Sequence, residues 1–220
     1  MRILVACEES QTVCKAFRAR GHEAYSADIQ EPSGGHPEWH ILGDVLPLID
    51  GDCTFTTMDG QPHRIDGEWD MIIAFPPCTD LAASGARHFS RKRADGSQER
   101  SKNFFLKFTT AKCKKIVIEN PIGIMSTCYR KPDQKVQPWE YGDGYQKTTC
   151  FWFIGDVKPL VPLVTEKPDL QYHEWIDKKT KKKKRQTQWY YDTRRQGKRR
   201  GKVASKTPQG LANAMAEQWG

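Results

Sequence analysis

The chain has 220 residues, of which 37% are hydrophobic and 10% aromatic, and this suits one folded domain with a small appendage. No apolar run is long enough to cross a membrane, and the N-terminal apolar segment turns acidic at Glu8 and Glu9, so neither a membrane span nor a secretory signal is expected. Seven cysteines without paired Cys-x-x-Cys spacing argue against a disulfide framework and a zinc site. We therefore expect a cytoplasmic protein in a reducing compartment, with no bound metal.

The net charge of +8 is distributed unevenly along the chain. Residues 178–202 contain thirteen lysines and arginines against one acid, Asp192, so this segment carries +12 and the rest of the chain −4. Like-charge runs are often solvated and partly disordered, and the same runs become ordered on phosphates. Trp189, Tyr190 and Tyr191 lie between the two basic blocks and offer rings that stack on bases. Nucleic acid is therefore the expected partner.

The N-terminal region has the pattern of a nucleotide-binding α/β unit. A strand is predicted at 2–6, a helix at 10–20 capped by Ser10, and a second strand at 22–27 that ends at Asp28. An acid in that place commonly accepts hydrogen bonds from ribose hydroxyls.

The turn after the first predicted strand lacks the glycine-rich fingerprint that cradles phosphates. The residues that stand there are Ala6, Cys7, Glu8, Glu9 and Ser10. Two acids disfavour a phosphate but are compatible with a cationic ligand that carries none. From these residues alone, a cofactor site and an ordinary turn both remain open.

The next stretch, 32–40, is rich in glycine and proline and contains His36 and His40. We expect a surface loop there, because the residues between the two histidines include a proline and the spacing is not that of a metal site. Strands at 54–57 and 63–65 flank an Asp-Gly pair that is typical of a hairpin turn.

Two further predicted strands end in residues with catalytic chemistry. The strand at 70–75 leads into Phe-Pro-Pro-Cys, which ends at Cys78, and the strand at 115–118 leads into Glu119 and Asn120. Proline cannot continue a central strand, so the chain leaves the sheet at Cys78, and ligands of open α/β sheets bind in the crevice outside the strand ends. Each turn alone is ordinary, but together a thiol and a carboxylate are suited to attack on a pyrimidine ring and management of its protons.

The remaining elements frame these two motifs. The polar and basic stretch 79–98 is expected to be a mobile active-site loop, followed by a helix at 98–112. A loop-rich region then leads to an alternating strand at 147–154, and the chain closes with a helix at 208–219.

At these motifs the chain resembles the DNA cytosine carbon-5 methyltransferase family, especially its small phage-type members. Phe-Pro-Pro-Cys at 75–78 resembles the nucleophile motif, and Ile-Glu-Asn-Pro at 118–121 resembles the Glu-Asn-Val motif with proline in the last place. Asp-Ile at 28–29 and Gly-Asp-Val at 43–45 are similar to the residues that hold the ribose and adenine of the cofactor. The resemblance covers most of residues 1–155 and the last fifteen or so.

The resemblance implies an α/β, Rossmann-like S-adenosylmethionine-dependent methyltransferase fold, with a mostly parallel sheet flanked by helices. It also implies methylation of cytosine carbon 5 in DNA through a covalent adduct, with Cys78 as the nucleophile and Glu119 bonding to the base. The residues expected at S-adenosylmethionine are Ala6, Cys7, Glu8, Ser10, Asp28, Ile29, Asp44, Val45 and Pro76. Those expected at the nucleic acid are Pro77, Arg87, Arg91, Asn120, Gln146, Lys147, Lys181, Lys182, Lys183, Lys184, Arg185, Arg194, Arg195, Arg199 and Arg200.

Three parts are predicted along the chain: a catalytic core at 1–155, a basic nucleic-acid-binding segment at 156–204, and a helix at 205–220 that returns to the core. The basic segment takes the place of a full target-recognition domain, so weak or very short sequence specificity is expected. We expect a monomer that acts on duplex DNA with a flipped-out cytosine, in the cytoplasm of a bacterium or a phage-infected host cell.

The chain departs from the family pattern in two places. The Phe-x-Gly-x-Gly cofactor loop is missing, and Thr148 and Cys150 stand where the family has two arginines after Gln146. Lys147, Arg87 and Arg91 are candidates to replace those arginines. Two alternatives remain open: an enzyme of the same fold that acts on RNA or on a free pyrimidine nucleotide, and a catalytically inactive nucleic-acid-binding module.

Overall fold

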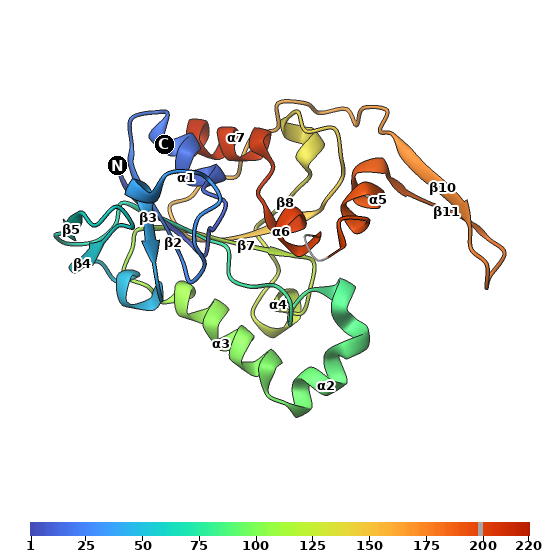
Figure 1. Ribbon diagram of the computed structural model, residues 1–220, viewed down its shortest axis with the longest axis horizontal. Coiled ribbons are helices and arrows are strands. Elements are labelled where there is room, and N and C mark those ends of the chain that lie inside the picture. The colour runs from blue at the N-terminus through green and yellow to red at the C-terminus, as the bar shows by residue number, and fades with distance from the viewer. Residues whose placement is uncertain (198–199) are drawn as a thin grey trace.

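The fold is built on a seven-stranded sheet of the order β3-β2-β1-β6-β7-β9-β8 (Figure 1). A computed structural model describes residues 1–197 and 200–220. Five neighbouring strands are parallel, whereas β9 runs antiparallel to β7 and to β8. The strands are β1 (Arg2–Ala6), β2 (Glu23–Asp28), β3 (His40–Leu42), β6 (Met71–Ala74), β7 (Lys115–Pro121), β8 (Gln134–Val136) and β9 (Thr149–Gly155).

This topology confirms the predicted fold class, an α/β, Rossmann-like and mostly parallel sheet flanked by helices. The chain builds the sheet outward from β1 to β3, then returns to the middle and builds the other half from β6. The carboxyl ends of β1 and β6 therefore flank the point where the strand order reverses. Ligands of open α/β sheets bind at that point.

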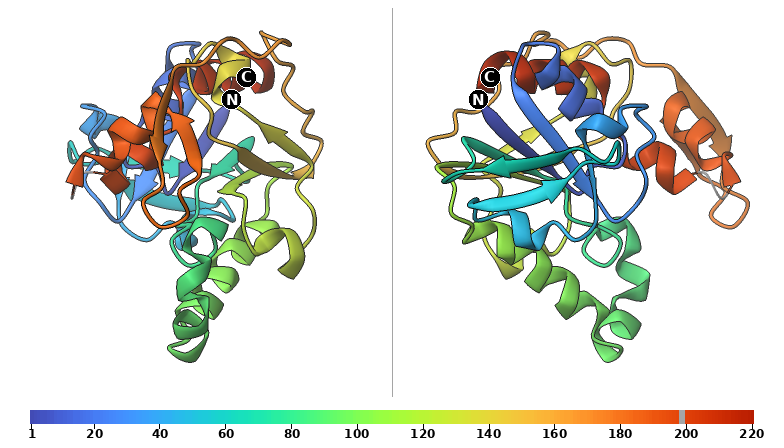
Figure 2. Two further views of the ribbon diagram at one scale, coloured as in Figure 1. Left: turned by 90° about the vertical axis from the view of Figure 1, so that its right-hand side faces the viewer. Right: turned by 60° about the vertical axis from the view of Figure 1, so that its left-hand side comes forward.

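Helices cover both faces of the sheet (Figure 2). Ile3 and Val5 of β1 pack with the buried side chains of α1 and α7, whereas Leu4 packs on the opposite face with Phe105 and Phe108 of α3. This alternation follows from the two-residue period of a strand. The covering helices are α1 (Thr12–Arg18), α3 (Ser97–Thr109) and α7 (Gln209–Trp219).

The predicted elements of the core are present with small shifts at their ends. The hairpin predicted around the Asp-Gly turn is β4 (Cys53–Thr56) with β5 (Pro62–Ile65). The cap predicted for the first helix is wrong, because Gln11 occupies the N-cap position, and Ser10 before it accepts only a long hydrogen bond from the Thr12 N–H (3.4 Å). Instead, the Glu8 carboxylate accepts hydrogen bonds from the backbone N–H groups of Val13 (2.6 Å) and Cys14 (3.1 Å). This satisfies donors that the start of a helix leaves open.

The stretch predicted as a loop at 79–98 is largely helical. It contains the 3₁₀ helix η3 (Ala83–His88) and the helix α2 (Phe89–Ala94), which precede α3. Its polar composition hid this helix from sequence reasoning. The loop-rich region after β7 likewise contains short elements, namely α4 (Met125–Cys128), strand β8 and the 3₁₀ helix η4 (Pro138–Tyr141).

The basic segment is folded where the structure describes it. An antiparallel hairpin of β10 (Tyr172–Ile176) and β11 (Lys183–Thr187) projects away from the sheet and is followed by α5 (Gln188–Arg194) and α6 (Arg200–Ser205) (Figure 1). Asp177 organises the hairpin turn, because its carboxylate accepts hydrogen bonds from the Thr180 backbone (2.7 Å) and pairs with Lys184 (2.7 Å). The remaining 3₁₀ helices are η1 (Pro37–Trp39) and η2 (Leu46–Leu48).

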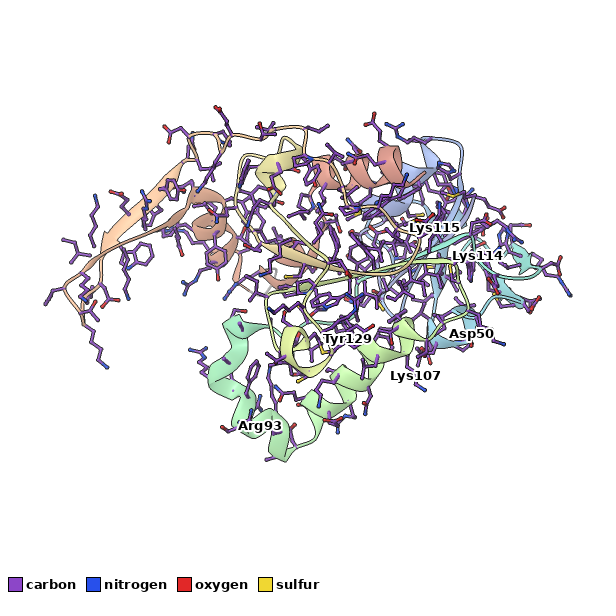
Figure 3. All side chains as sticks on the ribbon, turned by 180° about the vertical axis from the view of Figure 1, so that it is seen from behind. Asp50, Arg93, Lys107, Lys114, Lys115 and Tyr129 are labelled. Carbon is purple, nitrogen blue, oxygen red and sulfur yellow. The ribbon has the colours of Figure 1, made fainter. Side chains whose placement is uncertain are left out.

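A second group of basic side chains lies at the other edge of the sheet. Lys107 on α3 and Lys114 and Lys115 at the start of β7 gather at one end of the molecule (Figure 3). Since β7 runs parallel to β6, this is the edge opposite to the one that carries Cys78. Among residues 1–197 and 200–220, no helix is both long and apolar enough to span a membrane.

The turn after β7 packs tightly against the turn after β6. The backbone N–H of Ala83 donates to the Ile122 carbonyl (2.9 Å), and that of Ile124 donates to the Leu81 carbonyl (3.0 Å). Gly123 lies between these two bonds, and a Cβ atom there would stand 2.2 Å from the Leu81 oxygen. The close approach of the two turns therefore depends on the missing side chain.

We predict that Gly123→Ala destabilises the fold by about 1–3 kcal/mol, because backbone must move to admit the methyl group. Urea unfolding measures the change. Gly144→Ala is the matched control, since a Cβ at Gly144 meets nothing within 4 Å. Equal stability of the two variants would contradict the tight packing of the two turns.

Candidate active site

One buried hydrogen bond joins the two catalytic motifs. The side-chain amide of Asn120, which is 1% exposed, donates from Nδ2 to the carbonyl oxygen of Pro76 at 2.9 Å. Asn120 belongs to β7, next to Glu119, and Pro76 lies two residues before Cys78. The bond therefore holds the turn that carries Cys78 against the strand that carries Glu119. Asn120 was predicted at the nucleic acid, but its amide faces this turn.

Cys78 and Glu119 influence each other electrostatically at the carboxyl edge of the sheet. Partial burial raises the pKa of the exposed Cys78 thiol, the Glu119 carboxylate raises it further, and Lys147 opposes both. Burial also raises the pKa of Glu119, while Lys147 and the Thr149 hydroxyl lower it. The resting thiol therefore keeps its proton at neutral pH, and the carboxyl group holds a proton more readily than an exposed glutamate does.

Lys147 is positioned by the basic segment. Its ammonium group donates to the backbone carbonyl of Ala204 on α6 at 2.7 Å. The cation that lowers the pKa of both Cys78 and Glu119 is thus connected to the segment predicted to bind nucleic acid. The neighbouring Gln146 is exposed and accepts a hydrogen bond from Lys167 (3.1 Å).

A nearly buried ion pair anchors the segment that follows Cys78. Lys92 on α2 is 6% exposed, donates to the Thr79 carbonyl, and lies 3.1 Å from the Asp80 carboxylate. Asp80 also accepts a hydrogen bond from Ser101 on α3 (3.0 Å). The expected free loop is therefore tied down at its first residues. The sequence did not predict this ion pair, because Lys92 belongs to a run of basic residues that are all expected to be exposed.

The three strands on the other side of the crevice bring the predicted cofactor residues together. Cys7, in the left-handed region (φ 59°), follows β1, and its N–H donates to the Ala27 carbonyl at 2.7 Å. Burial raises the pKa of the Cys7 thiol, and Asp28 after β2 and Asp44 after β3 raise it further. The two carboxylates therefore lie close enough to act on one side chain. Ile29, next to Asp28, is 79% exposed.

Each acid in the turn after β1 has a partner within the protein. Glu8 is buried and caps α1, and burial raises the pKa of its carboxyl group to about 7 despite those hydrogen bonds. The Glu9 carboxylate pairs with Lys202 on α6 at 2.6 Å. Ser10 makes its contacts with Glu8 and Thr12. Glu8 and Ser10 thus shape the turn, and the protein itself supplies a cation to Glu9.

The remaining predicted cofactor residues differ in exposure. Ala6, Val45 and Pro76 are buried, and Asp44 is exposed with its carboxylate accepting the Leu46 N–H at 3.0 Å. The histidines of the 32–40 loop bind protein groups: His36 contacts Glu38 (2.8 Å), and His40 contacts Ser26 (2.8 Å).

The predicted nucleic-acid residues fall into two groups. Pro77, Arg87 and Arg91 are exposed on the segment that begins at Cys78 and continues through η3 and α2. The second group is exposed on the hairpin and on the helices after it, and consists of Lys181, Lys182, Lys183, Lys184, Arg185, Arg194, Arg195 and Arg200. Arg199 lies outside the described residues.

Comparisons with known proteins add little to this geometry. No protein-family model matches the chain, and no curated protein matches it. Among solved structures, the chain is similar to a protein named as a DNA modification methyltransferase encoded within a prophage (E. coli), with 15% sequence identity and a TM-score of 0.42. The match covers 69% of this chain and 45% of that one, so the chain spans less than half of that protein's length. Similarity at this level does not determine the family or the activity.

The charges around Cys78 predict opposite effects of two substitutions on its reactivity. Glu119→Gln removes a negative charge that raises the pKa of the thiol, so alkylation by iodoacetamide at pH 8 should become several-fold faster. Lys147→Gln removes a positive charge that lowers this pKa, so alkylation should become several-fold slower. Peptide mapping by mass spectrometry assigns the label to Cys78. Rates that change in the same direction would contradict the arrangement of the three groups.

Proposed function

We propose that this protein is a DNA methyltransferase that transfers a methyl group from S-adenosylmethionine to carbon 5 of cytosine. The observation that carries the proposal is the hydrogen bond from Asn120 to Pro76, which keeps Cys78 and Glu119 at one crevice of a Rossmann-like sheet.

The residues on the cofactor side fit S-adenosylmethionine by their chemistry. The carboxylates of Asp28 and Asp44 are suited to ribose hydroxyls and to the adenine amino group, and the exposed side chain of Ile29 offers an apolar surface for the adenine ring. The acidic turn after β1 disfavours a phosphate, and its Glu9 is already paired with Lys202. When bound, this cofactor supplies an electrophilic methyl group next to the nucleophile.

Cys78 activates the base by forming a covalent bond. The thiol loses its proton to water and Sγ adds to carbon 6 of cytosine, so that carbon 5 becomes enamine-like and would take up the methyl group, with S-adenosylhomocysteine as the leaving group. Water also serves as the acceptor for the proton that carbon 5 later loses. Loss of the proton from carbon 5 then expels the thiolate and restores the double bond between carbons 5 and 6. Lys147 lowers the pKa of the thiol and so favours the thiolate that starts this sequence.

Glu119 stabilises the adduct from the other side of the ring. In its protonated form the carboxyl group donates to nitrogen 3, where negative charge develops on attack, and its second oxygen accepts from the exocyclic amine. The raised pKa of Glu119 makes that protonated form accessible near neutral pH. The two residues thus act on opposite ends of one polarised bond system.

The basic segment supplies the affinity for duplex DNA. Its hairpin, α5 and α6 carry exposed lysines and arginines, and contacts to phosphates release counterions. Extrusion of the target cytosine costs a few kcal/mol, which binding of the backbone must offset. An enzyme for a free pyrimidine nucleotide would have no use for such a segment, whereas RNA remains an alternative that the following experiment separates.

We predict transfer of labelled methyl groups from S-adenosylmethionine to 5-methylcytosine in unmodified duplex DNA, with a loss on the order of a thousandfold or more in Cys78→Ser. RNA and dCMP are assayed in parallel, and Cys128→Ser, which removes another exposed thiol, is the control that keeps activity. Label in RNA or dCMP alone would establish the second candidate. No transfer to any substrate, with DNA binding intact, would identify an inactive binding module.

We predict that Lys179, Lys181 and Lys182 on the hairpin contact phosphates. Their replacement by glutamine should reduce the slope of log K against log salt by about 0.9 for each phosphate contact that is lost. The control replaces Lys107, Lys114 and Lys115 by glutamine, which changes the net charge equally at the opposite edge of the sheet (Figure 3). Equal salt slopes in the two triple variants would overturn this assignment.

A further inference from the structure

The basic segment contains a hollow that the proposed chemistry does not use. It has a volume of about 360 Å³ and lies between one face of the β10–β11 hairpin and α5. The side chains that line it are His173, Trp175, Gln186, Tyr191, Arg194 and Arg195. The hollow therefore combines aromatic rings, one amide and two guanidinium groups.

The strand register explains why these side chains face the same way. His173 and Trp175 are two residues apart on β10, and His173 is paired with Gln186 on β11, so all three point to one face of the hairpin. The rings are nearly parallel: His173 and Tyr191 have centroids 3.5 Å apart at 18°, and His173 and Trp175 have centroids 6.0 Å apart at 22°. Together they form a stacked platform.

The charge of the hollow is positive. Arg194 and Arg195 are exposed, and no acidic side chain is among the described residues that line the hollow. Arg195 is held by the aromatic platform, because its guanidinium donates to the Tyr191 hydroxyl (2.9 Å) and lies 5.5 Å from the Tyr191 ring. A flat ring next to two guanidinium groups is the chemistry of a nucleotide site, with a surface for a base and donors for a phosphate.

Helix α5, which carries Tyr191 and Arg194 of the hollow, packs against the segment that precedes β9. Trp189 on α5 stacks on Tyr145, with centroids 4.1 Å apart and planes at 9°, and Tyr145 lies two residues before Lys147. Lys147 in turn bonds to Ala204 on α6. Trp189 of α5 and Ala204 of α6 thus contact Tyr145 and Lys147, respectively. Lys147 is the residue that lowers the pKa of Cys78 and of Glu119.

We propose that this hollow binds one unstacked nucleotide of a DNA strand outside the catalytic crevice, with the base on the aromatic platform and its phosphate at Arg194. The choice of DNA as the strand rests on the proposed function. The amide of Gln186 meets the edge of the base. A site of this kind gives the short basic segment a grip on DNA in addition to its attraction for phosphates, since stacking accepts every base.

A duplex with a single unpaired 2-aminopurine tests the site, because the fluorescence of this base falls when it stacks on an aromatic ring. Binding is measured without cofactor and in the Cys78→Ser background. We expect Trp175→Ala to weaken binding roughly 5- to 100-fold and to abolish the quenching, and Trp175→Phe to restore both. Ile176→Ala, an exposed neighbour on the other face of the hairpin, is the matched control and should bind as the parent does.

Arg194→Gln provides a second test that leaves the aromatic packing intact. This substitution should reduce the slope of log K against log salt by roughly 0.7–0.9, the value for one lost phosphate contact. The fluorescence of 2-aminopurine should still be quenched at low salt. Arg64→Gln is the control of equal charge and should leave the salt slope unchanged, since Arg64 is exposed on β5, outside the basic segment.

Two outcomes overturn the proposal: quenching that survives Trp175→Ala, or equal losses in the Trp175→Ala and Ile176→Ala variants. Neither depends on catalysis, so the two proposals fail separately. Quenching that requires Trp175 in a protein that transfers no methyl group would support the hollow and contradict the proposed enzyme. Normal methyl transfer with quenching indifferent to Trp175 would do the reverse.

Discussion

The candidate site depends on the hydrogen bond between Asn120 and Pro76. Both groups are buried, so loss of the amide would leave a carbonyl without a partner, at a cost of about 1–3 kcal/mol. Pro76 has no backbone N–H to donate to a neighbouring strand. Its carbonyl oxygen accepts the hydrogen bond from the Asn120 amide. The same bond holds together the turns of Cys78 and Glu119, which are more than forty residues apart in sequence. One contact thus contributes both to the packing of the sheet and to the arrangement of the candidate site.

Sequence patterns predicted the framework well, for physical reasons that particular residues illustrate. The apolar runs of β1, β6 and β7 are bounded by acids, prolines or glycines, and each is buried in the sheet. The prolines and the acid that end the apolar runs also indicated that Cys78 and Glu119 lie at strand ends. Their placement in one crevice follows from parallel strands in neighbouring positions, since β6 pairs directly with β7.

The missed features depend on contacts between distant residues. Lys92 is buried only because Asp80 and the Thr79 carbonyl accept its charge, and no local pattern distinguishes it from its exposed neighbours. The β10–β11 hairpin carries lysines where a strand pattern would show apolar residues, and its turn is held by Asp177. Glu8 was predicted to contact the cofactor, whereas it accepts hydrogen bonds from the first turn of α1. It lies before the N-cap residue, so no regular sequence spacing marks it as a helix cap.

Helix α6 touches both halves of the crevice, through Lys202 at Glu9 and through Ala204 at Lys147. Any contact that fixes the position of α6 therefore acts both on the turn after β1 and on Lys147. Under the proposed function, binding of DNA to the basic segment and binding of the cofactor near Glu9 would be thermodynamically linked, and each would change the affinity for the other by the same factor. Lys202 is about half exposed, so its ion pair contributes at most about 1 kcal/mol to that linkage. The final equilibrium is therefore the same whichever of the two ligands binds first.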